Sequence, residues 1–259
     1  LDEYGRNAGA EVNYQNEKGE WQGWLGYHHS FKPGISAKNS FLNYGGGYFG
    51  RNFSSFIDYD NVGTNYYTDI GFVERIENYD AFRDTVMRLG FKQYYNENSY
   101  RIIPEKGKVN RHVFQSENFV VINPNNSLNE REHRFSYNIE FKNTSIFELE
   151  FSNTQTNLQF HTSFTDEDPL PPGRYHYNQY SVNYSTDIRK DFSFEAGVTL
   201  GKYYSGNYFQ YAAEATFRKQ PWLTLQLTAE FNKLTFPDPY GKEDLFLLAP
   251  RVEINFSNK

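Results

Sequence analysis

Six histidines, at positions 28, 29, 112, 133, 161 and 176, are the first residues that could bind metal or move protons. None of them belongs to an HExxH motif or a comparable pair of metal ligands. His28 and His29 are adjacent, so in a strand they point to opposite faces and cannot hold one ion together. We interpret the histidines as boundary residues in the rim of a barrel.

The acidic run Asp166-Glu167-Asp168 offers carboxylate oxygens, which are the ligands that Ca²⁺ prefers. The run lacks the spaced ligand positions of a calcium-binding loop. It lies in a long segment, 153–177, that we expect to connect two strands. We therefore favour a solvated acidic loop, with a calcium site as the alternative.

Motifs for catalysis are missing from the sequence. The chain has no Cys, which excludes thiolate chemistry, and no G-x-S-x-G nucleophile elbow. The glycines at 45–47 are not followed by the Lys-Ser or Lys-Thr pair of a phosphate-binding loop. We predict no catalytic residues, no metal and no cofactor, and hence a protein that is not an enzyme.

The elements that must position any functional residue are β-strands, because apolar and polar side chains alternate from residue 178 onward. The apolar positions carry no charge, as expected where a Lys or Arg facing lipid costs about 2 to 4 kcal/mol. They are Tyr180, Val182, Tyr184, Phe192, Phe194, Ala196, Val198, Leu200, Phe209, Tyr211, Ala213, Ala215, Phe217, Leu223, Leu225, Leu227, Ala229, Phe231, Phe246, Leu248, Val252, Ile254 and Phe256.

The alternating polar positions of the same strands include five charged residues, Glu195, Glu214, Glu230, Arg251 and Glu253. In a barrel these would face the lumen, where they could line a pore or could pair with one another and fill the interior. We favour structural packing of the lumen, with pore lining as the alternative.

The rest of the chain divides into further strands, so that about 13 strands of 8 to 12 residues are expected, each long enough to cross a bilayer at a tilt. The N-terminal ones are predicted at 8–15, 21–31, 40–49, 53–59, 64–76, 84–95, 133–141 and 146–153. Short turns at 16–20, 50–52, 77–80, 142–145, 188–191 and 218–221 alternate with longer segments at 32–39, 96–131, 153–177 and 232–244. This sorting of connections is typical of outer-membrane barrels. Pro250 predicts a bulge, and Gly45 to Gly47 predict a bend or close packing.

Composition agrees with an all-β membrane protein. Aromatic residues make up 19% of the chain, and they favour strands and membrane interfaces. The mean hydropathy is −0.79, and no window of the sequence approaches the roughly 18 apolar residues that a transmembrane helix needs. A net charge of −6 without a basic stripe argues against nucleic acid as a partner.

We therefore expect an all-β fold, a transmembrane antiparallel up-and-down β-barrel that occupies residues 1–259 as a single domain. Bacterial single-chain barrels have an even number of strands. An odd number here predicts a part of a larger even-numbered barrel, in which a long loop hides a strand or the last strands lie outside this sequence.

Several short stretches resemble a family of Bacteroidota outer-membrane β-barrels. They are Asp69-Ile70-Gly71-Phe72-Val73, Leu170-Pro171-Pro172-Gly173-Arg174-Tyr175, Gly201-Lys202-Tyr203-Tyr204-Ser205-Gly206 and Ala249-Pro250-Arg251-Val252-Glu253-Ile254-Asn255-Phe256-Ser257. The barrels of that family are known as a domain of unknown function, which usually follows a module resembling family-nine carbohydrate-binding modules. The resemblance covers the barrel portion, implies that an N-terminal domain and further strands lie outside this sequence, and supplies no catalytic residues.

The predicted location is the outer membrane of a Gram-negative bacterium, with the lipid bilayer and lipopolysaccharide as partners. The function we favour is a structural or scaffold subunit of an outer-membrane complex, in contact with other outer-membrane proteins or lipoproteins. The alternatives are a porin-like channel for small solutes and a surface carbohydrate-binding barrel.

The tyrosines Tyr175, Tyr177, Tyr203, Tyr204, Tyr208 and Tyr240 bear on the last alternative, because sugar rings stack on aromatic faces. We interpret them instead as girdle residues at the lipid boundary, where tyrosines of barrel strands usually lie.

Overall fold

The computed structural model describes residues 5–68 and 73–256. Every regular secondary-structure element in those ranges is a β-strand. No helix that could cross a membrane occurs among those residues. In chain order the strands are β1 (Arg6–Gln15), β2 (Trp21–Phe31), β3 (Ser40–Phe49), β4 (Phe53–Val62), β5 (Glu77–Asp80), β6 (Thr85–Arg88), β7 (Phe91–Ile102), β8 (Val109–Ile122), β9 (Leu128–Phe141), β10 (Ile146–Leu158), β11 (Gly173–Ser185), β12 (Phe192–Tyr203), β13 (Gly206–Lys219), β14 (Leu223–Thr235) and β15 (Lys242–Ile254).

Thirteen of these strands form one antiparallel sheet, and β5 and β6 form a separate two-stranded hairpin. Each strand of the large sheet pairs with the strand that follows it along the sheet, in the order β1-β2-β3-β4-β7-β8-β9-β10-β11-β12-β13-β14-β15. Such an order is an up-and-down meander. The predictions of an all-β class and of antiparallel up-and-down pairing are confirmed.

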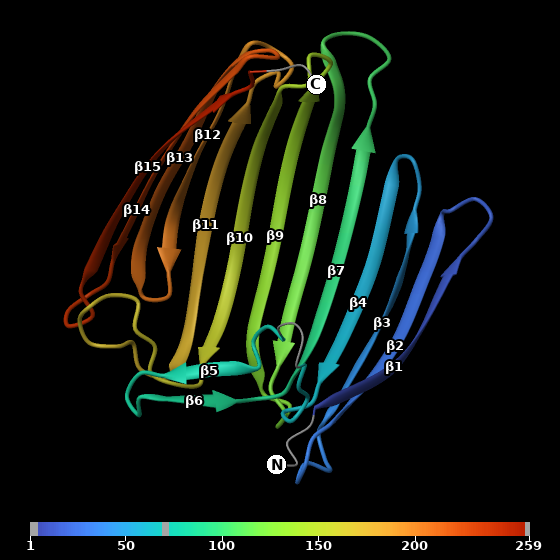
Figure 1. The fold of residues 1–259 in the computed structure, drawn as a ribbon, viewed down its shortest axis with the longest axis vertical. Helices are drawn as coiled ribbons and strands as arrows, with labels where there is room; N and C mark the ends of the chain where they lie inside the picture. Colours follow the sequence, from blue (N-terminus) through green and yellow to red (C-terminus); the bar gives the residue numbers. More distant parts are fainter. Residues whose placement is uncertain (1–4, 69–72, 257–259) are drawn as a thin grey trace.

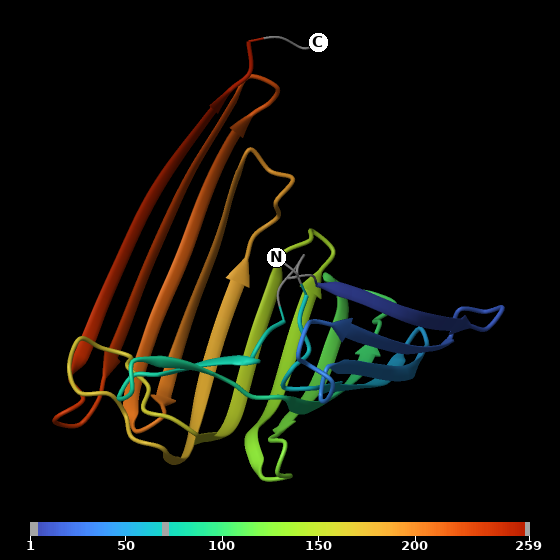
Figure 2. The ribbon, with the colours of Figure 1, turned by 60° about the horizontal axis from the view of Figure 1, so that its bottom comes forward.

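The large sheet is curved into a trough and is not closed into a barrel. Figure 1 looks into the hollow of the trough, and Figure 2 shows that β1 to β4 turn away from the wall formed by β11 to β15. The two edge strands are β1 and β15, and within the described residues each has only one neighbouring strand. Both edges therefore present unpaired backbone N–H and C=O groups.

The strands of the middle of the chain differ from the predicted ones. Residues 64–68 and 73–76 form turns and irregular backbone where we expected a strand, while residues 69–72 lie outside the described residues. The segment 77–80 is β5 and not a turn. The predicted long loop 96–131 is wrong, because it holds most of β7, all of β8 and the start of β9.

The turns at the two ends of the sheet differ in length, although less regularly than predicted. At one end the connections 16–20, 50–52, 103–108, 142–145, 186–191 and 220–222 are all short. The other end carries the long connections 63–90 and 159–172, but also the tight turns 123–127 and 204–205. The predicted turns near 16–20, 50–52, 142–145, 188–191 and 218–221 are confirmed.

The described residues contain very little apolar core. One small cluster of Val62, Tyr66 and Ile76 packs with Phe41, Val73 and Phe91 where the connection 63–90 meets the sheet. Large hydrophobic side chains that are exposed far outnumber those that are buried. A sandwich that buries one face of each sheet against the other is thus not the architecture of this chain.

Two local predictions have different outcomes. Gly45 packs closely, as expected, because an added Cβ would collide with the ring of Trp24 and with the carbonyl oxygen of Ile57. Trp24 lies over this glycine and donates its indole N–H to Asp58 Oδ1 at 2.9 Å. The bulge predicted at Pro250 is wrong, because the pairing of β14 with β15 continues through Pro250 without a register shift. An edge strand can accommodate a proline in this way.

Candidate functional site: the polar concave face

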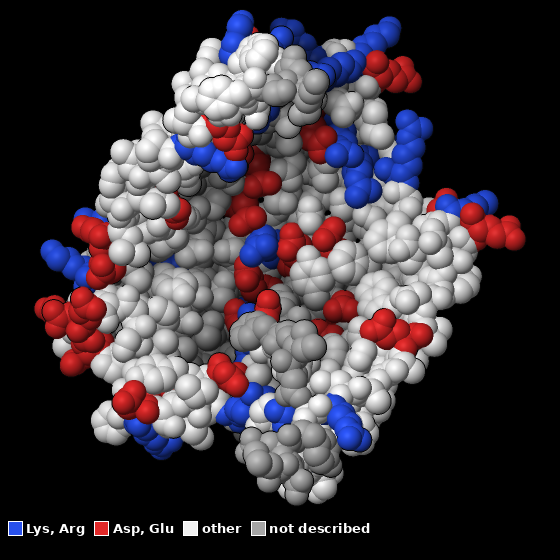
Figure 3. All heavy atoms as spheres, viewed as in Figure 1, with Lys and Arg blue, Asp and Glu red and all other residues white. Residues whose placement is uncertain are grey.

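The register divides the sheet into a polar concave face and a largely apolar convex face, because cross-strand partners point to the same side. Glu195 lies opposite Glu214, and Glu214 lies opposite Thr228. The residues between them, such as Phe194 and Leu227, point to the other side and are exposed. Figure 3, in the same view as Figure 1, shows acidic and basic side chains gathered in the hollow.

All five charged residues singled out in the sequence lie on the concave face by this register. Glu195 and Glu214 form one directly opposed pair, and Glu230 lies opposite Ala212. Arg251 and Glu253, on the edge strand β15, lie opposite Gln226 and Thr224 and form an ion pair with each other. The role of these side chains in a lumen stays a prediction.

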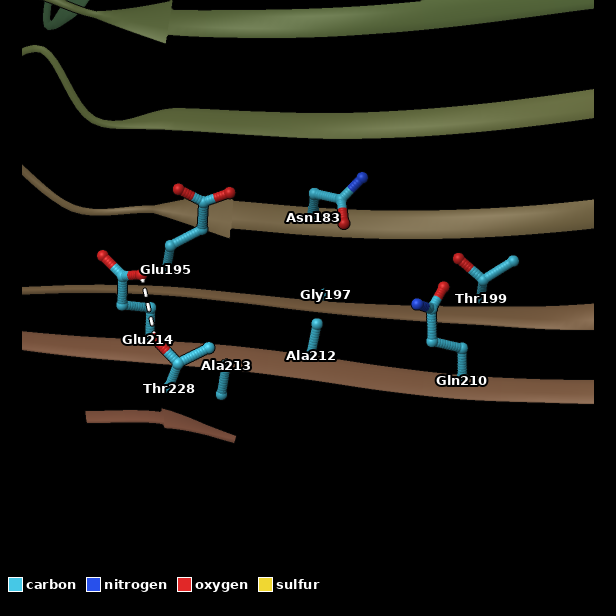
Figure 4. Close-up of a pocket in the computed structure, with 9 residues that line it drawn as sticks. All are labelled: Asn183, Glu195, Gly197, Thr199, Gln210, Ala212, Ala213, Glu214 and Thr228. Carbon is cyan, nitrogen blue, oxygen red and sulfur yellow. Dashed lines mark hydrogen bonds between the residues drawn. The ribbon is translucent and has the colours of Figure 1, made fainter. Parts of the chain in front are cut away.

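Glu195 and Glu214 belong to a shallow hollow of about 270 Å³ between β11 and β14. Figure 4 shows the residues that line it, which are Asn183, Glu195, Gly197, Thr199, Gln210, Ala212, Ala213, Glu214 and Thr228. Thr228 Oγ1 donates to Glu214 Oε2 at 3.2 Å. Within the described residues neither carboxylate forms an ion pair with a Lys or Arg side chain, and like charges placed directly opposite repel.

Glu230, by contrast, is satisfied by neutral donors on the same face. Its Oε1 accepts hydrogen bonds from Gln210 Nε2 at 2.9 Å and from Asn232 Nδ2 at 2.8 Å. Asn232 Oδ1 in turn accepts from the Tyr208 hydroxyl at 3.0 Å. These side chains therefore cross-link β13 and β14 on the concave face.

The middle of the concave face carries an ion cluster that the sequence analysis missed. Arg134 of β9 lies 3.3 Å from Glu117 of β8, 2.9 Å from Glu132 and 3.6 Å from Glu150 of β10. Three carboxylates surround one guanidinium, so the cluster has an excess of negative charge. Glu117 was missed because it fell in the predicted loop, whereas the alternation of Glu130, Glu132 and Arg134 could have indicated an inward face.

One end of the hollow is lined by aromatic rings. Phe164 of the connection 159–172 lies 5.3 Å from Tyr203 and 5.9 Å from Phe236, and Tyr177 lies 5.7 Å from Tyr203, as ring-centroid distances. A cavity of about 380 Å³ opens beside them, lined by Phe164, Gln179, Tyr203, Tyr208, Asn232, Leu234, Glu243 and Leu245.

These rings correct the interpretation of the tyrosines. Tyr175 and Tyr177 share the concave face with Asn183, and Tyr203 and Tyr208 share it with Thr199 and Gln210. Tyr204 packs on Tyr175 and Tyr177 in the same cluster. They are therefore not girdle residues on the outward surface. Their side of the sheet follows from the register and not from their position near strand ends.

The connection 63–90 reaches over the same end of the trough, as Figure 2 shows for β5 and β6. Ala81 N donates to the His161 carbonyl at 2.9 Å, and the rings of Phe82 and His161 lie 5.1 Å apart. Arg75 Nη1 donates to Glu130 Oε2 at 2.6 Å, and its guanidinium lies 4.9 Å from the centre of the Phe119 ring. The two long connections are thus joined to each other and to the concave face.

The acidic run lies on the connection 159–172, where Asp166, Glu167 and Asp168 are all exposed. Their carboxylates do not converge, and across residues 5–68 and 73–256 no three His, Cys, Asp or Glu side chains are placed to hold one metal ion. The solvated loop that we favoured over a calcium site stays a prediction.

Comparisons with models of protein families and with curated proteins find no match for this chain. The concave face itself combines carboxylates, amides, hydroxyls and tyrosines. Such a surface can hold water, polar solutes or a plug, and it can stiffen the wall.

Proposed function

We propose that this chain is the wall of a transmembrane β-barrel in the outer membrane of a Gram-negative bacterium and that it serves as a structural subunit of an outer-membrane complex. The observation that carries the proposal is the convex face of β12 to β15. Large uncharged side chains such as Leu200, Leu227 and Phe246 are 51%, 46% and 64% exposed there. An apolar surface that extends over several strands needs hydrocarbon or a partner against it.

The open edges of the sheet fit the same proposal. Unpaired strand edges are not tolerated in hydrocarbon, because no water is present to satisfy their backbone groups. In the membrane, β1 and β15 would therefore pair with further strands, which would complete a larger, even-numbered barrel. Lipid tails and lipopolysaccharide would surround the convex face.

A structural role is favoured over passage by the two long connections that lie over one end of the trough. The connections 63–90 and 159–172 are joined by the Ala81 to His161 hydrogen bond, and the aromatic cluster around Tyr203 lies beneath them. Passage of small solutes is the second candidate, because the concave face between β7 and β14 is polar and hollowed.

Membrane fractionation tests the proposal. We expect the protein to require detergent for extraction and to migrate faster on gels when it is not heated, as a folded barrel does. Native gels of a mild detergent extract should show it in a complex larger than one chain. Extraction into buffer alone would contradict the membrane assignment. Steady ion conductance of the isolated protein in planar bilayers would favour passage over the structural role.

A further inference from the structure

The convex face differs in chemistry at the two ends of the strands. At the end of the short connections it carries a row of aromatic rings. The ring centroids of Trp21 and Tyr48 lie 5.2 Å apart, and those of Tyr48 and Phe53 lie 6.5 Å apart. Phe53 lies opposite Tyr100, and Tyr100 lies opposite Phe114. The row continues at the same end of β9 to β13 with Tyr137, Phe147, Tyr184, Phe192 and Phe217. Such a row is typical of a boundary between membrane and water.

At the end of the long connections, six cationic side chains lie on the convex face. They are Lys92 of β7, Arg131 of β9, Arg174 of β11, Lys202 of β12, Lys233 of β14 and Lys242 of β15, which we call the basic belt. Each lies within four residues of the end of its strand, at the lower end in Figure 1, where β5 and β6 lie. Each also lies an even number of residues from an exposed apolar side chain of its own strand, as Lys92 does from Tyr94 and Lys202 from Leu200. Because side chains alternate along a strand, the six share the convex face.

The basic belt has almost no acidic counterpart. In the last four positions at this end of the thirteen strands of the sheet, Asp244 is the one carboxylate on the convex face. The other carboxylates near this end, such as Glu130 and Glu243, lie on the concave face.

The cations themselves are not neutralised. Within residues 5–68 and 73–256, none of the six forms an ion pair with Asp or Glu. Lys92 Nζ donates to Asn126 Oδ1 at 2.9 Å, and Arg131 Nη2 donates to Gln155 Oε1 at 3.4 Å, both of which are neutral acceptors. The other four side chains are exposed. This border of the convex face therefore carries uncompensated positive charge.

The spacing of the two ends fits the two borders of a membrane. On β12, Phe192 and Lys202 enclose the apolar convex residues Phe194, Ala196, Val198 and Leu200. Ten residues at about 3.3 Å each, tilted by about 40°, span roughly 25 Å, which is the height of the apolar band of a barrel. The basic belt then lies at the depth of lipid headgroups. Lys and Arg can extend their apolar stems along hydrocarbon while their charged ends reach phosphate groups, and Arg can bind a phosphate through two hydrogen bonds.

We infer that the basic belt binds the phosphate groups of lipopolysaccharide in the outer leaflet, and that the connections 63–90 and 159–172 consequently lie outside the cell. The inference rests on the proposed function and names the lipid that one border of the convex face recognises. The outer leaflet is favoured because the long connections lie at the same end as the belt, and long connections of outer-membrane barrels face outward. Anionic phospholipid of the inner leaflet would require the opposite orientation.

Binding of purified lipopolysaccharide to the full-length protein in detergent micelles tests the belt. The belt variant combines Arg174→Gln, Lys202→Gln and Lys233→Gln. The matched control combines Arg51→Gln, Lys190→Gln and Lys219→Gln, which remove the same charge from exposed positions at the opposite end. We expect the Kd, measured by thermophoresis, to rise on the order of tenfold to a hundredfold in the belt variant and less than about threefold in the control. The heat-dependent gel shift shows whether each variant is folded.

Two further probes identify the ligand. Lipopolysaccharide whose phosphates have been removed should bind the parent protein much more weakly, and this arm needs no variant. Micelles that contain phosphatidylglycerol should also bind more weakly than lipopolysaccharide does. Equal losses in the two triple variants, unchanged binding after removal of the phosphates, or equal affinity for phosphatidylglycerol would overturn the inference.

Thiol labelling tests the orientation, because residues 1–259 contain no cysteine that would compete. A maleimide too large to pass through porins should label Asp168→Cys on intact cells. It should label Lys190→Cys only after the outer membrane has been permeabilised, and the unsubstituted protein is the blank. The reverse pattern would overturn the inference while leaving the membrane assignment intact. Extraction of the protein without detergent would instead mark failure of the proposed function, and the inference would fall with it.

Discussion

At the scale of single residues, the same substitution at two adjacent positions of one strand should lower stability by very different amounts. Leu227 points to the convex face and Thr228 to the concave face beside Glu214. We expect Leu227→Arg to lower the free energy of unfolding by about 2 to 4 kcal/mol in lipid vesicles, because the charge would face hydrocarbon. Thr228→Arg should cost less than about 1 kcal/mol, since water and a carboxylate are near. Denaturant titration of both variants measures the difference, and equal losses would contradict the assignment of faces.

Asp187 makes a residue-scale prediction about pH in the turn 186–191. Arg189 donates to both of its oxygens at 2.8 Å, and Thr144 donates to one at 3.0 Å, so these hydrogen bonds hold the pKa of Asp187 well below its usual range. A lowered pKa contributes stability that is complete above the ordinary value of about 3.9 and is lost as the pH falls through the folded-state pKa. Asp187→Asn should therefore be less stable than the parent at neutral pH, and the difference should begin to shrink as the pH falls below about 4 toward the folded-state pKa.

Unfolding profiles of both proteins from pH 7 to pH 2 measure this convergence. Arg189→Gln removes the same interaction from the other side and should show the same profile. Curves for parent and variants that stay parallel down to pH 2 would contradict a pH-dependent contribution of the pair to stability.

At the scale of elements, the β5–β6 hairpin should depend on its contacts with the trough. Arg75 is the side chain that reaches the concave face, through Glu130 and the Phe119 ring. Arg75→Gln should speed hydrogen exchange of residues 77–88 by about three- to tenfold, because an ion pair and a cation–π contact are lost. Exchange in β12 to β14 should not change. Arg51→Gln, in an exposed turn at the opposite end, is the control, and an equal effect of Arg51→Gln would contradict a specific role for Arg75.

At the scale of the whole molecule, the two open edges predict how the chain behaves in a membrane. If further strands complete a barrel, backbone amides of β1 and β15 should exchange as slowly as those of β8 and β9 in the full-length protein in detergent micelles. Deuterium uptake of peptides from residues 6–15 and 242–254 measures this. Rapid uptake at both edges, with protected central strands, would mean that the sheet remains open.

The alternation of apolar and polar residues predicted those strands whose two faces each lie in one uniform environment. From β12 to β15 the apolar positions and the charged positions Glu195, Glu214 and Glu230 follow the pattern that the sequence indicates, because each face of those strands has a uniform environment. The same rule failed for β8. There the convex positions Ser116 and Asn118 are polar, and so is Glu117 on the other face, so no period-two pattern is visible. These polar residues on both faces of β8 are the reason that this strand was predicted as a loop.

Apolar residues with the spacing of a strand can also occur where no strand forms. Tyr66 and Ile76 lie in the predicted strand 64–76, but the structure uses them in a small core with Val62, where the connection 63–90 folds back on the sheet. The sequence did not indicate on which face of the sheet the tyrosines at 175, 177, 203 and 208 lie, because tyrosine is common both at a lipid boundary and in an aromatic cluster.

The sequence by itself determined that this chain is all-β and antiparallel, and which residues of its last strands share a face, because those features depend only on local periodicity and short turns. The tertiary structure decided the rest. Register brings Glu117, Arg134 and Glu150 together and aligns Asn96, Asn118, His133 and Asn153 across β7 to β10. Folding of the connections 63–90 and 159–172 joins them over one end. Contacts of this kind join residues from separate strands, so their geometry depends on pairing and curvature that no single stretch of sequence contains.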